Sequence, residues 1–375
     1  MRVYLFACIE KNIGDDLFVK LLCERYPDIV FVITSKAKYG SLKRIPNLVF
    51  SDVLKKWNWA SSLCPNNKIK SVVAKVIQVY YTFKLPKYKI GVSIVGNAFK
   101  NPEYSGWAQS RWIREKIKLV DKFYIMSTNF GPYKDERWKT DFEKIFSTMS
   151  DVCFRDKYSF DLFSNLSNVR FAPDAVFTMG KKQHENNKNV IISVIDCSFY
   201  ARNENLKKVA PVFEKKMAET IDILYQNGYT VTLLNSNTEQ DKPACKRILK
   251  MIGSHDISVV DYDGDLDLIF ELYKHSSFVI GTRLHTIILG WLYNMSVVPI
   301  VYDIKVSNLL DACSYNQALF DITQLDCVTG LDIVNALVNN HYVVSKDILD
   351  NAQNQFLKLD DILLKGEAKY EKSSF

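Results

Sequence analysis

Three side chains that can bind anions or move protons come directly after one short apolar strand. Residues 278–280 form a β-branched run that stops at Gly281, and Thr282, Arg283 and His285 follow. A helix is expected to begin there, and its first turn presents free N–H groups and a positive dipole end to an anion. Arginine can bind a carboxylate or phosphate with two hydrogen bonds, and histidine exchanges protons near neutral pH. The spacing predicts an anion-binding and acid/base site, although helix caps and surface ion pairs use the same residue types.

Four other expected strand ends carry polar residues. These residues are Asn12 and Asp15, Asn97 after Gly96, Arg155, and Asp174 after a proline. Asp15 also suits a helix cap, and Gly96 also suits a simple turn. The first loop has neither a complete dinucleotide fingerprint nor the Lys-Ser/Thr of a phosphate loop, so it does not support nucleotide binding. Because carboxyl ends of parallel strands form the ligand edge of an α/β sheet, we expect these residues to face a cleft.

The elements that must position these residues alternate along almost the whole chain. Strands are expected at 3–8, 28–34, 90–95, 123–127, 152–154, 190–195, 230–234, 258–260, 278–280 and 297–301. Helices are expected at about 15–25, 136–149 and 206–226, the last closed by Asn227-Gly228. This alternation predicts two Rossmann-like domains with parallel sheets.

Composition suggests where the domains divide. Residues 180–189 are polar with no apolar anchor, which is typical of a linker. We therefore expect an N-terminal Rossmann-like domain at 1–179, the linker at 180–189, a C-terminal Rossmann-like domain at 190–344 and a helical tail at 345–375.

The chain has 375 residues, of which 47% are hydrophobic and 24% charged, a globular composition. The eight cysteines are scattered without CxxC or metal-ligand spacing, which favours reduced thiols. No signal segment or apolar run of about 20 residues is visible. We therefore expect a cytoplasmic protein that uses neither a metal nor a cofactor; oligomeric state cannot be predicted.

A basic segment, defined here as residues 53–102, contains nine lysines, no arginine and no acidic residue. Aromatic residues are interleaved with the lysines, which suits an anionic membrane surface. The absence of arginine and of any recognisable binding motif argues against nucleic acid. The alternative is a solvated basic helix face. We expect peripheral attachment to the inner face of the membrane.

Several short motifs occur in the order found in polysaccharide pyruvyl transferases, and over about residues 8–305 the chain resembles that family. The motifs are Asn12-Ile-Gly14-Asp15, Gly131-Pro132, Arg155-Asp156 with Ser159, Pro173-Asp174 with Phe177, Thr282-Arg283-Leu284-His285, and Pro299 with Tyr302-Asp303 and Lys305. Arg-Leu-His with the downstream proline and lysine is the most specific part. One departure is Val95-Gly96-Asn97, where the family often has a glycine-rich loop, so we expect a different acceptor side. The resemblance implies that the first domain holds the acceptor side and the second the donor side.

The resemblance implies a GT-B-like fold and transfer of pyruvate from phosphoenolpyruvate to two hydroxyls of one sugar. The product would be a cyclic ketal made during cell-surface exopolysaccharide or capsule biosynthesis, with a lipid-linked oligosaccharide as one form of acceptor. Under this reading His285 is the acid/base, and Asp15 or Asp174 orients or deprotonates the sugar. Arg283, Arg155, Lys305 and Thr282 bind the donor. The expected acceptor contacts are Asn12, Asn97, Tyr104, Trp107 and Arg111.

Two other functions fit the same pattern. A nucleotide-sugar-dependent GT-B glycosyltransferase would also place basic residues against phosphates, and fold alone does not separate the two. A non-catalytic scaffold of a polysaccharide assembly complex would tolerate alanine at Arg283 and His285.

Overall fold

The computed structural model describes residues 1–33, 40–51, 88–99, 106–198, 204–253 and 256–365. The chain divides into two compact units. Unit 1 comprises Met1–Ile9, Phe18–Ala175 and Gln353–Phe375, and unit 2 comprises Glu10–Leu17 and Val176–Ala352.

Unit 1 contains a seven-stranded parallel sheet in the order β3-β2-β1-β4-β5-β6-β7. Its strands are β1 (Arg2–Phe6), β2 (Val30–Ile33), β3 (Leu48–Phe50), β4 (Tyr88–Ile94), β5 (Val120–Thr128), β6 (Asp151–Phe154) and β7 (Val169–Phe171). Its helices are η1 (Gly40–Arg44), α4 (Gly106–Ile117), α5 (Glu136–Phe146), α6 (Lys157–Asp161), η4 (Gln353–Phe356) and α14 (Leu357–Leu363). The strand order reverses between β1 and β4, which is the point where doubly wound sheets bind ligands.

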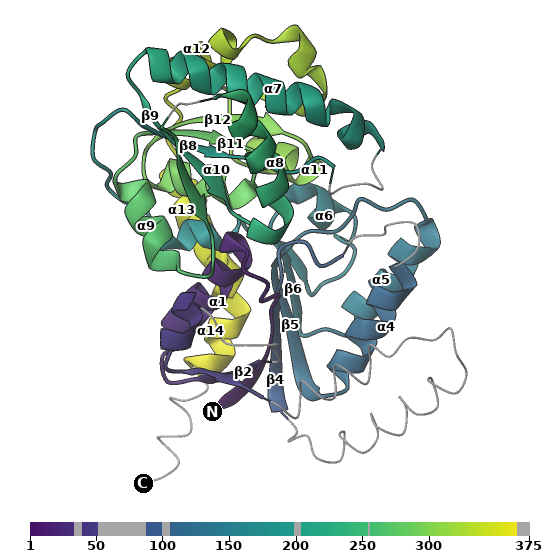
Figure 1. Cartoon of the computed structure of the whole chain (residues 1–375). Coiled ribbons are helices and arrows are strands. Elements are labelled where there is room, and N and C mark those ends of the chain that lie inside the picture. The colour runs from purple at the N-terminus through teal and green to yellow at the C-terminus, as the bar shows by residue number, and fades with distance from the viewer. Residues whose placement is uncertain (34–39, 52–87, 100–105, 199–203, 254–255, 366–375) are drawn as a thin grey trace, which may run out of the picture. The chain divides into compact units, whose positions relative to one another are not determined.

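Helices cover both faces of the unit 1 sheet, with α4 and α5 on one side and α14 on the other (Figure 1). Helix α5 buries Trp138, Phe142, Ile145 and Phe146, spaced so that they share one face. Phe130, which follows β5, lies among these rings, 4.4 Å from Trp138 and 4.8 Å from Phe163 between centroids. This aromatic core fixes the chain immediately after the end of β5.

Helix α1 (Ile13–Arg25) is shared, because residues up to Leu17 group with unit 2 and the rest with unit 1. Its unit 1 end lies beside α14 (Figure 1). There the Arg25 guanidinium donates to both carboxylate oxygens of Asp360, at 2.8 and 2.6 Å, and lies 4.5 Å from the ring centroid of Phe356. The C-terminal residues are thus part of unit 1.

Unit 2 contains a six-stranded parallel sheet in the order β10-β9-β8-β11-β12-β13. Its strands are β8 (Asn189–Ser193), β9 (Thr230–Asn235), β10 (Ser258–Asp261), β11 (Phe278–Gly281), β12 (Ser296–Val301) and β13 (Phe320–Asp321). Its helices are η2 (Ala175–Met179), which begins at the last unit 1 residue, α7 (Glu204–Gln226), α8 (Thr238–Met251), α9 (Leu266–Lys274), α10 (Leu284–Leu292), α11 (Ile304–Ala312), η3 (Ile322–Cys327), α12 (Gly330–Asn339) and α13 (Lys346–Ala352). Here the order reverses between β8 and β11.

The expected fold class, α/β with two Rossmann-like parts of GT-B-like type and a C-terminal helix, is confirmed. The unit boundaries fall elsewhere than expected from composition. Residues 180–188 hydrogen-bond within unit 2, where the Lys182 N–H donates to the Leu292 carbonyl at 2.7 Å and that of Glu185 to the Lys274 carbonyl at 2.8 Å. Polar composition predicted a linker because it does not reveal where backbone hydrogen bonds go.

Candidate active site

Helix α10 begins where sequence analysis expected an anion-binding turn, immediately after β11. The Thr282 hydroxyl is fully buried and donates to the Ser193 carbonyl at the end of β8, at 2.7 Å. This bond joins the two strands between which the sheet order reverses. Of residues 279–293, all are buried except Arg283 and His285, which keep partial exposure. Both predicted functional side chains thus keep partial exposure on an otherwise buried element, although the Nε2 atom of His285 is itself buried.

Arg283 is held by Asp241, a fully buried residue of α8. The Arg283 Nε donates to Asp241 Oδ2 at 3.2 Å, and Nη2 pairs with Oδ1. Burial raises the pKa of the Asp241 carboxyl, while Arg283 and the backbone N–H of Asn237 oppose that rise. A two-bond contact along one edge fixes the plane of the guanidinium. The structure therefore orients Arg283 rigidly at the end of the unit 2 sheet.

The imidazole of His285 packs directly on the backbone of Gly14 in the first turn of α1. A Cβ atom at Gly14 would overlap Nδ1 and Cε1 of the ring. Gly14 is not in the left-handed region, so the need for glycine comes from this close approach. Asn12 caps the turn, since its Oδ1 accepts from the Gly14 N–H at 2.9 Å.

Other contacts hold this segment of α1 to unit 2. The Ile13 N–H donates to the Ser236 carbonyl at 3.3 Å, and Asn12 forms an isolated antiparallel bridge with Asn237. The Tyr262 hydroxyl donates to Asp16 Oδ2 at 2.5 Å in a buried pair. Predicted residues Asn12 and Asp15 therefore lie in the same unit as His285 and Arg283.

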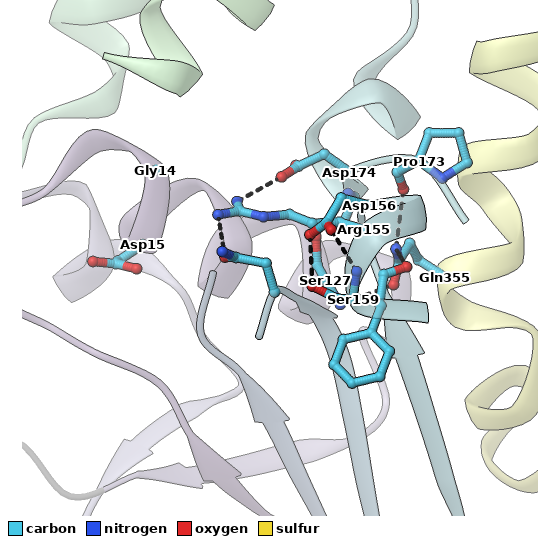
Figure 2. Close-up of polar contacts among 12 residues, drawn as sticks. Gly14, Asp15, Ser127, Arg155, Asp156, Ser159, Pro173, Asp174 and Gln355 are labelled. Carbon is cyan, nitrogen blue, oxygen red and sulfur yellow. Dashed lines mark hydrogen bonds and ion pairs between the residues drawn. The ribbon is translucent and has the colours of Figure 1, made fainter. Parts of the chain in front are cut away.

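In unit 1, Arg155 lies at the carboxyl end of β6 within a buried cluster. Its Nη1 donates to Asp174 Oδ2 at 2.8 Å and its Nη2 to Asn129 Oδ1 at 3.0 Å. Figure 2 shows the Arg155 guanidinium extended toward the Asp174 carboxylate. A Cβ at Gly96 would lie 2.7 Å from Nη1, so the guanidinium lies against that glycine. We call Gly96, Asn129, Arg155 and Asp174 the Arg155 cluster; its members follow β4, β5, β6 and β7.

The ion pair bears on the base role predicted for Asp174. Asp174 and Arg155 are 2% and 6% exposed at their side chains. The Oδ2 atom of Asp174 is thus occupied by the Arg155 guanidinium. Asp174 as sugar base stays a prediction; the structure adds a contact through which it orients Arg155.

The remaining predicted residues are scattered over both units. Lys305 lies in the first turn of α11, 14% exposed, with its Nζ 5.1 Å from the Tyr302 ring centroid. Asn97 follows Gly96 and is half-buried. Trp107 and Arg111 fall within α4. Tyr104 lies outside the described residues, as does most of the basic segment, so their acceptor and membrane roles stay predictions.

Sequence reasoning did not single out Asp241 or Asn129. Asp241 lies 42 residues from Arg283 in the first turn of α8. An acidic residue is common there because it interacts favourably with the helix dipole, so its sequence position does not indicate a partner. Asn129 directly follows the end of β5, so the strand-end criterion applied to the other loops would also have identified it.

Three further features of the described residues concern metal ligands, thiols and membrane spans. In those ranges, no group of three or more His, Cys, Asp or Glu side chains could hold a metal ion. Burial raises the pKa of Cys197, after β8, to about 12, and that of Cys153, in β6, to about 12, so these thiols stay protonated at neutral pH. None of the helices in the described ranges has the length and apolarity needed to cross a bilayer.

The family model for polysaccharide pyruvyl transferase matches residues 12–304. The match covers most of the 375-residue chain, so this chain belongs to the polysaccharide pyruvyl transferase family and is an enzyme. No curated protein gives a significant sequence match.

Several solved structures are similar in fold. The co-structure of S. aureus MnaA with UDP has a TM-score of 0.57 at 10% identity, covering 97% of this chain and 96% of that one. UDP-GlcNAc 2-epimerase from Methanocaldococcus jannaschii has a TM-score of 0.54 at 8% identity, with 96% and 99% covered. A putative UDP-N-acetylglucosamine 2-epimerase from Listeria monocytogenes has a TM-score of 0.52 at 11% identity, with 99% and 96% covered. At these identities the likeness establishes the fold alone.

Proposed function

We propose that this enzyme transfers a pyruvyl group from phosphoenolpyruvate to two hydroxyls of one sugar residue, forming a cyclic ketal. The observation that carries the proposal is that Arg283 and His285 both lie at the start of α10, where the strand order of the unit 2 sheet reverses. Asp241 orients Arg283, and His285 packs on Gly14. This arrangement offers an anion contact beside a proton carrier, and the donor requires both.

His285 is the proposed proton carrier. It protonates the methylene carbon of the donor, so that positive charge develops at the neighbouring carbon that bears the phosphate. A sugar hydroxyl attacks that carbon and loses its proton, phosphate leaves with its bonding electrons, and the second hydroxyl closes the ring. The two sugar hydroxyls lose two protons in total. One replaces the proton that His285 gave to the methylene carbon, and the other leaves with phosphate or buffer.

The anionic groups of the donor are assigned to arginines. Arg283 binds one of them, helped by the N-terminal turn of α10, while Thr282 maintains the local backbone. Arg155 is the proposed second anion contact, and Lys305 adds a positive charge. Asp15 orients or deprotonates the sugar. Asn12, Asn97, Trp107 and Arg111 remain the proposed acceptor contacts, and a lipid-linked oligosaccharide is the proposed acceptor.

The deciding experiment compares donors. The enzyme is incubated with an acceptor oligosaccharide and either phosphoenolpyruvate or UDP-sugars, and phosphate release and ketal formation are followed, the latter by NMR. We expect consumption of phosphoenolpyruvate only. Loss of a sugar nucleotide instead would favour the glycosyltransferase alternative.

The role of His285 is tested by His285→Ala. We expect turnover to fall by about 100-fold to 10,000-fold, the usual contribution of a positioned acid or base. Binding of phosphoenolpyruvate, measured by calorimetry, should largely survive because the arginines remain. Near-normal ketal formation by His285→Ala would remove His285 from the mechanism.

A further inference from the structure

We propose that Gln355, from the C-terminal segment, is a positioning residue that sets the geometry of the Arg155 cluster. The inference rests on the proposed function for its kinetic readout, because Arg155 is assigned to donor binding. Gln355 lies in η4 and is 1% exposed. It is more than 180 residues from the strand ends that its side chain contacts.

The Gln355 amide joins the ends of three adjacent strands. Its Oε1 accepts from the Ser127 N–H in β5 at 2.8 Å. Its Nε2 donates to the Ala172 carbonyl after β7 at 2.7 Å, and lies 3.1 Å from the Pro173 carbonyl and 3.4 Å from that of Phe154 in β6. Figure 2 shows the amide beside Pro173. Only a group that donates and accepts at once satisfies this set.

On one side of the cluster, Gln355 stabilises an unusual backbone conformation. Ser127 has φ +51°, in the left-handed region that non-glycine residues disfavour, where the β5–β6 register is interrupted. Two contacts hold it, the bond to Gln355 and a 2.9 Å bond from the Ala175 N–H to the Ser127 hydroxyl. The bend precedes Asn129 by two residues, and Asn129 meets Arg155.

On the other side, Gln355 fixes the loop that carries the carboxylate of the cluster. Pro173, whose carbonyl faces the Gln355 amide, immediately precedes Asp174. Thus Asn129 and Asp174, the two side chains that hold the Arg155 guanidinium, each follow within two residues a backbone group that Gln355 binds. Because a buried ion pair depends strongly on geometry, loss of these bonds should displace Arg155.

The η4 segment is anchored without the Gln355 side chain. Arg170 donates to the backbone carbonyls of Asn354 and, at 3.0 Å, Gln355, and it also binds Asp151. Arg25 binds Asp360 in the next helix. Variants of Gln355 should therefore keep the segment in place, and their effect reports on the Arg155 cluster.

The test compares Gln355→Ala and Gln355→Glu with the full-length wild type. We expect Gln355→Ala to raise KM for phosphoenolpyruvate by about tenfold with a smaller change in kcat, since a ground-state anion contact is disturbed.

In Gln355→Glu an ionised carboxylate would face backbone carbonyls at about pH 8. Burial raises carboxyl pKa values, so at about pH 6 the protonated acid can donate as the amide does. Its KM relative to wild type should therefore recover as pH falls.

Gln353→Ala is the matched control, because Gln353 is in the same short helix but exposed, bonding only to Arg25 at 2.7 Å among described contacts. Its KM should equal that of wild type. A wild-type KM in Gln355→Ala, or a KM ratio independent of pH in Gln355→Glu, would overturn the positioning role.

Hydrogen exchange separates this proposal from the proposed function. If the wild type fails to consume phosphoenolpyruvate, the donor assignment fails, and exchange at residues 127–129 and 172–175 then decides the positioning role. Gln355→Ala should speed exchange there and Gln353→Ala should not. Unchanged exchange in Gln355→Ala would overturn the proposal on its own.

Discussion

Gly14 and Gly96 each provide a flat backbone surface for a side chain assigned to the chemistry. His285 packs on Gly14 within unit 2, and the Arg155 guanidinium packs on Gly96 within unit 1. Neither glycine has a positive φ. Steric room for a functional side chain explains both residues.

This explanation predicts the effect of Gly14→Ala. Alanine favours a helix over glycine by up to about 1 kcal/mol, so propensity alone would make the change harmless or stabilising. The added Cβ must displace the His285 ring, and a shift of about 1 Å at a reacting group can cost about 100-fold in rate. We expect kcat to fall by about that factor while KM for phosphoenolpyruvate changes little.

A double-mutant cycle provides the control for Gly14→Ala. If the methyl group acts through His285, adding Gly14→Ala to His285→Ala should cause little further loss. Additive losses in the double variant would show that Gly14 acts by another route.

The sequence was sufficient to find the charged residues of the site but not their partners. Strand-end logic identified Arg155 and Arg283 because the apolar runs before them are unambiguous. It missed Asp241 and Gln355 because pairings over 42 and 228 residues are not encoded in local spacing. Local spacing also does not reveal why residue 14 is glycine, since the ring packed against it comes from residue 285.

At the scale of elements, local rules predicted most strands and, among the helices, α1, α5 and α7. Helix α7 ends as expected, with Gly228 at φ +72° and the Tyr229 N–H returning to the Leu224 carbonyl. The expected helical tail from about Ser345 is three pieces, α13, η4 and α14. The interruption is the segment that places Gln355 among the strand ends, so tertiary contacts determine it.

Helix α4 carries a buried lysine with consequences for stability. Lys116 is 1% exposed, and its Nζ lies 5.5 Å from the Phe6 ring centroid. Burial lowers its pKa to about 7. The unfolded chain holds this proton up to about pH 10.4. Above pH 7 the unfolded state therefore binds more protons, and stability from this group rises with pH by up to about 1.4 kcal/mol per unit.

Lys116→Met retains the apolar stem and removes the charge. We expect it to be more stable than wild type at about pH 6, with a difference that shrinks as pH rises toward about 8.5. Urea unfolding at several pH values measures this difference. Lys118→Met is the control, because the Lys118 side chain is 67% exposed and should give no such trend. A pH-independent difference for Lys116→Met would mean that the lysine stays charged in the fold.

At the scale of the whole molecule, the chain passes between its units at four places, after residues 9, 17, 175 and 352. Alternation of strands and helices predicted two parallel sheets, and this is confirmed. It could not assign residues 10–17 to unit 2 or 353–363 to unit 1. Those assignments depend on individual contacts such as Tyr262 with Asp16 and Arg25 with Asp360.

The net charge of the molecule, +7, is concentrated in the basic segment, whose nine lysines face no acidic residue in sequence. Each lysine near an anionic membrane contributes about 1 kcal/mol to binding. We predict that the protein sediments with phosphatidylglycerol vesicles but not with pure phosphatidylcholine, and that added salt weakens binding. Changing Lys68, Lys70 and Lys75 to glutamate lowers the charge of the segment from +9 to +3 and should abolish sedimentation.

The control must change the total charge equally at another place. Lys118, Lys157 and Lys365 are suitable because their side chains are 67%, 72% and 76% exposed. The triple glutamate variant at these positions has the same net charge as the first and should keep most of its vesicle binding, since the charges that contact the membrane remain. Equal loss in both triple variants would mean that net charge alone governs binding. Binding insensitive to salt would mean that the basic segment does not mediate it.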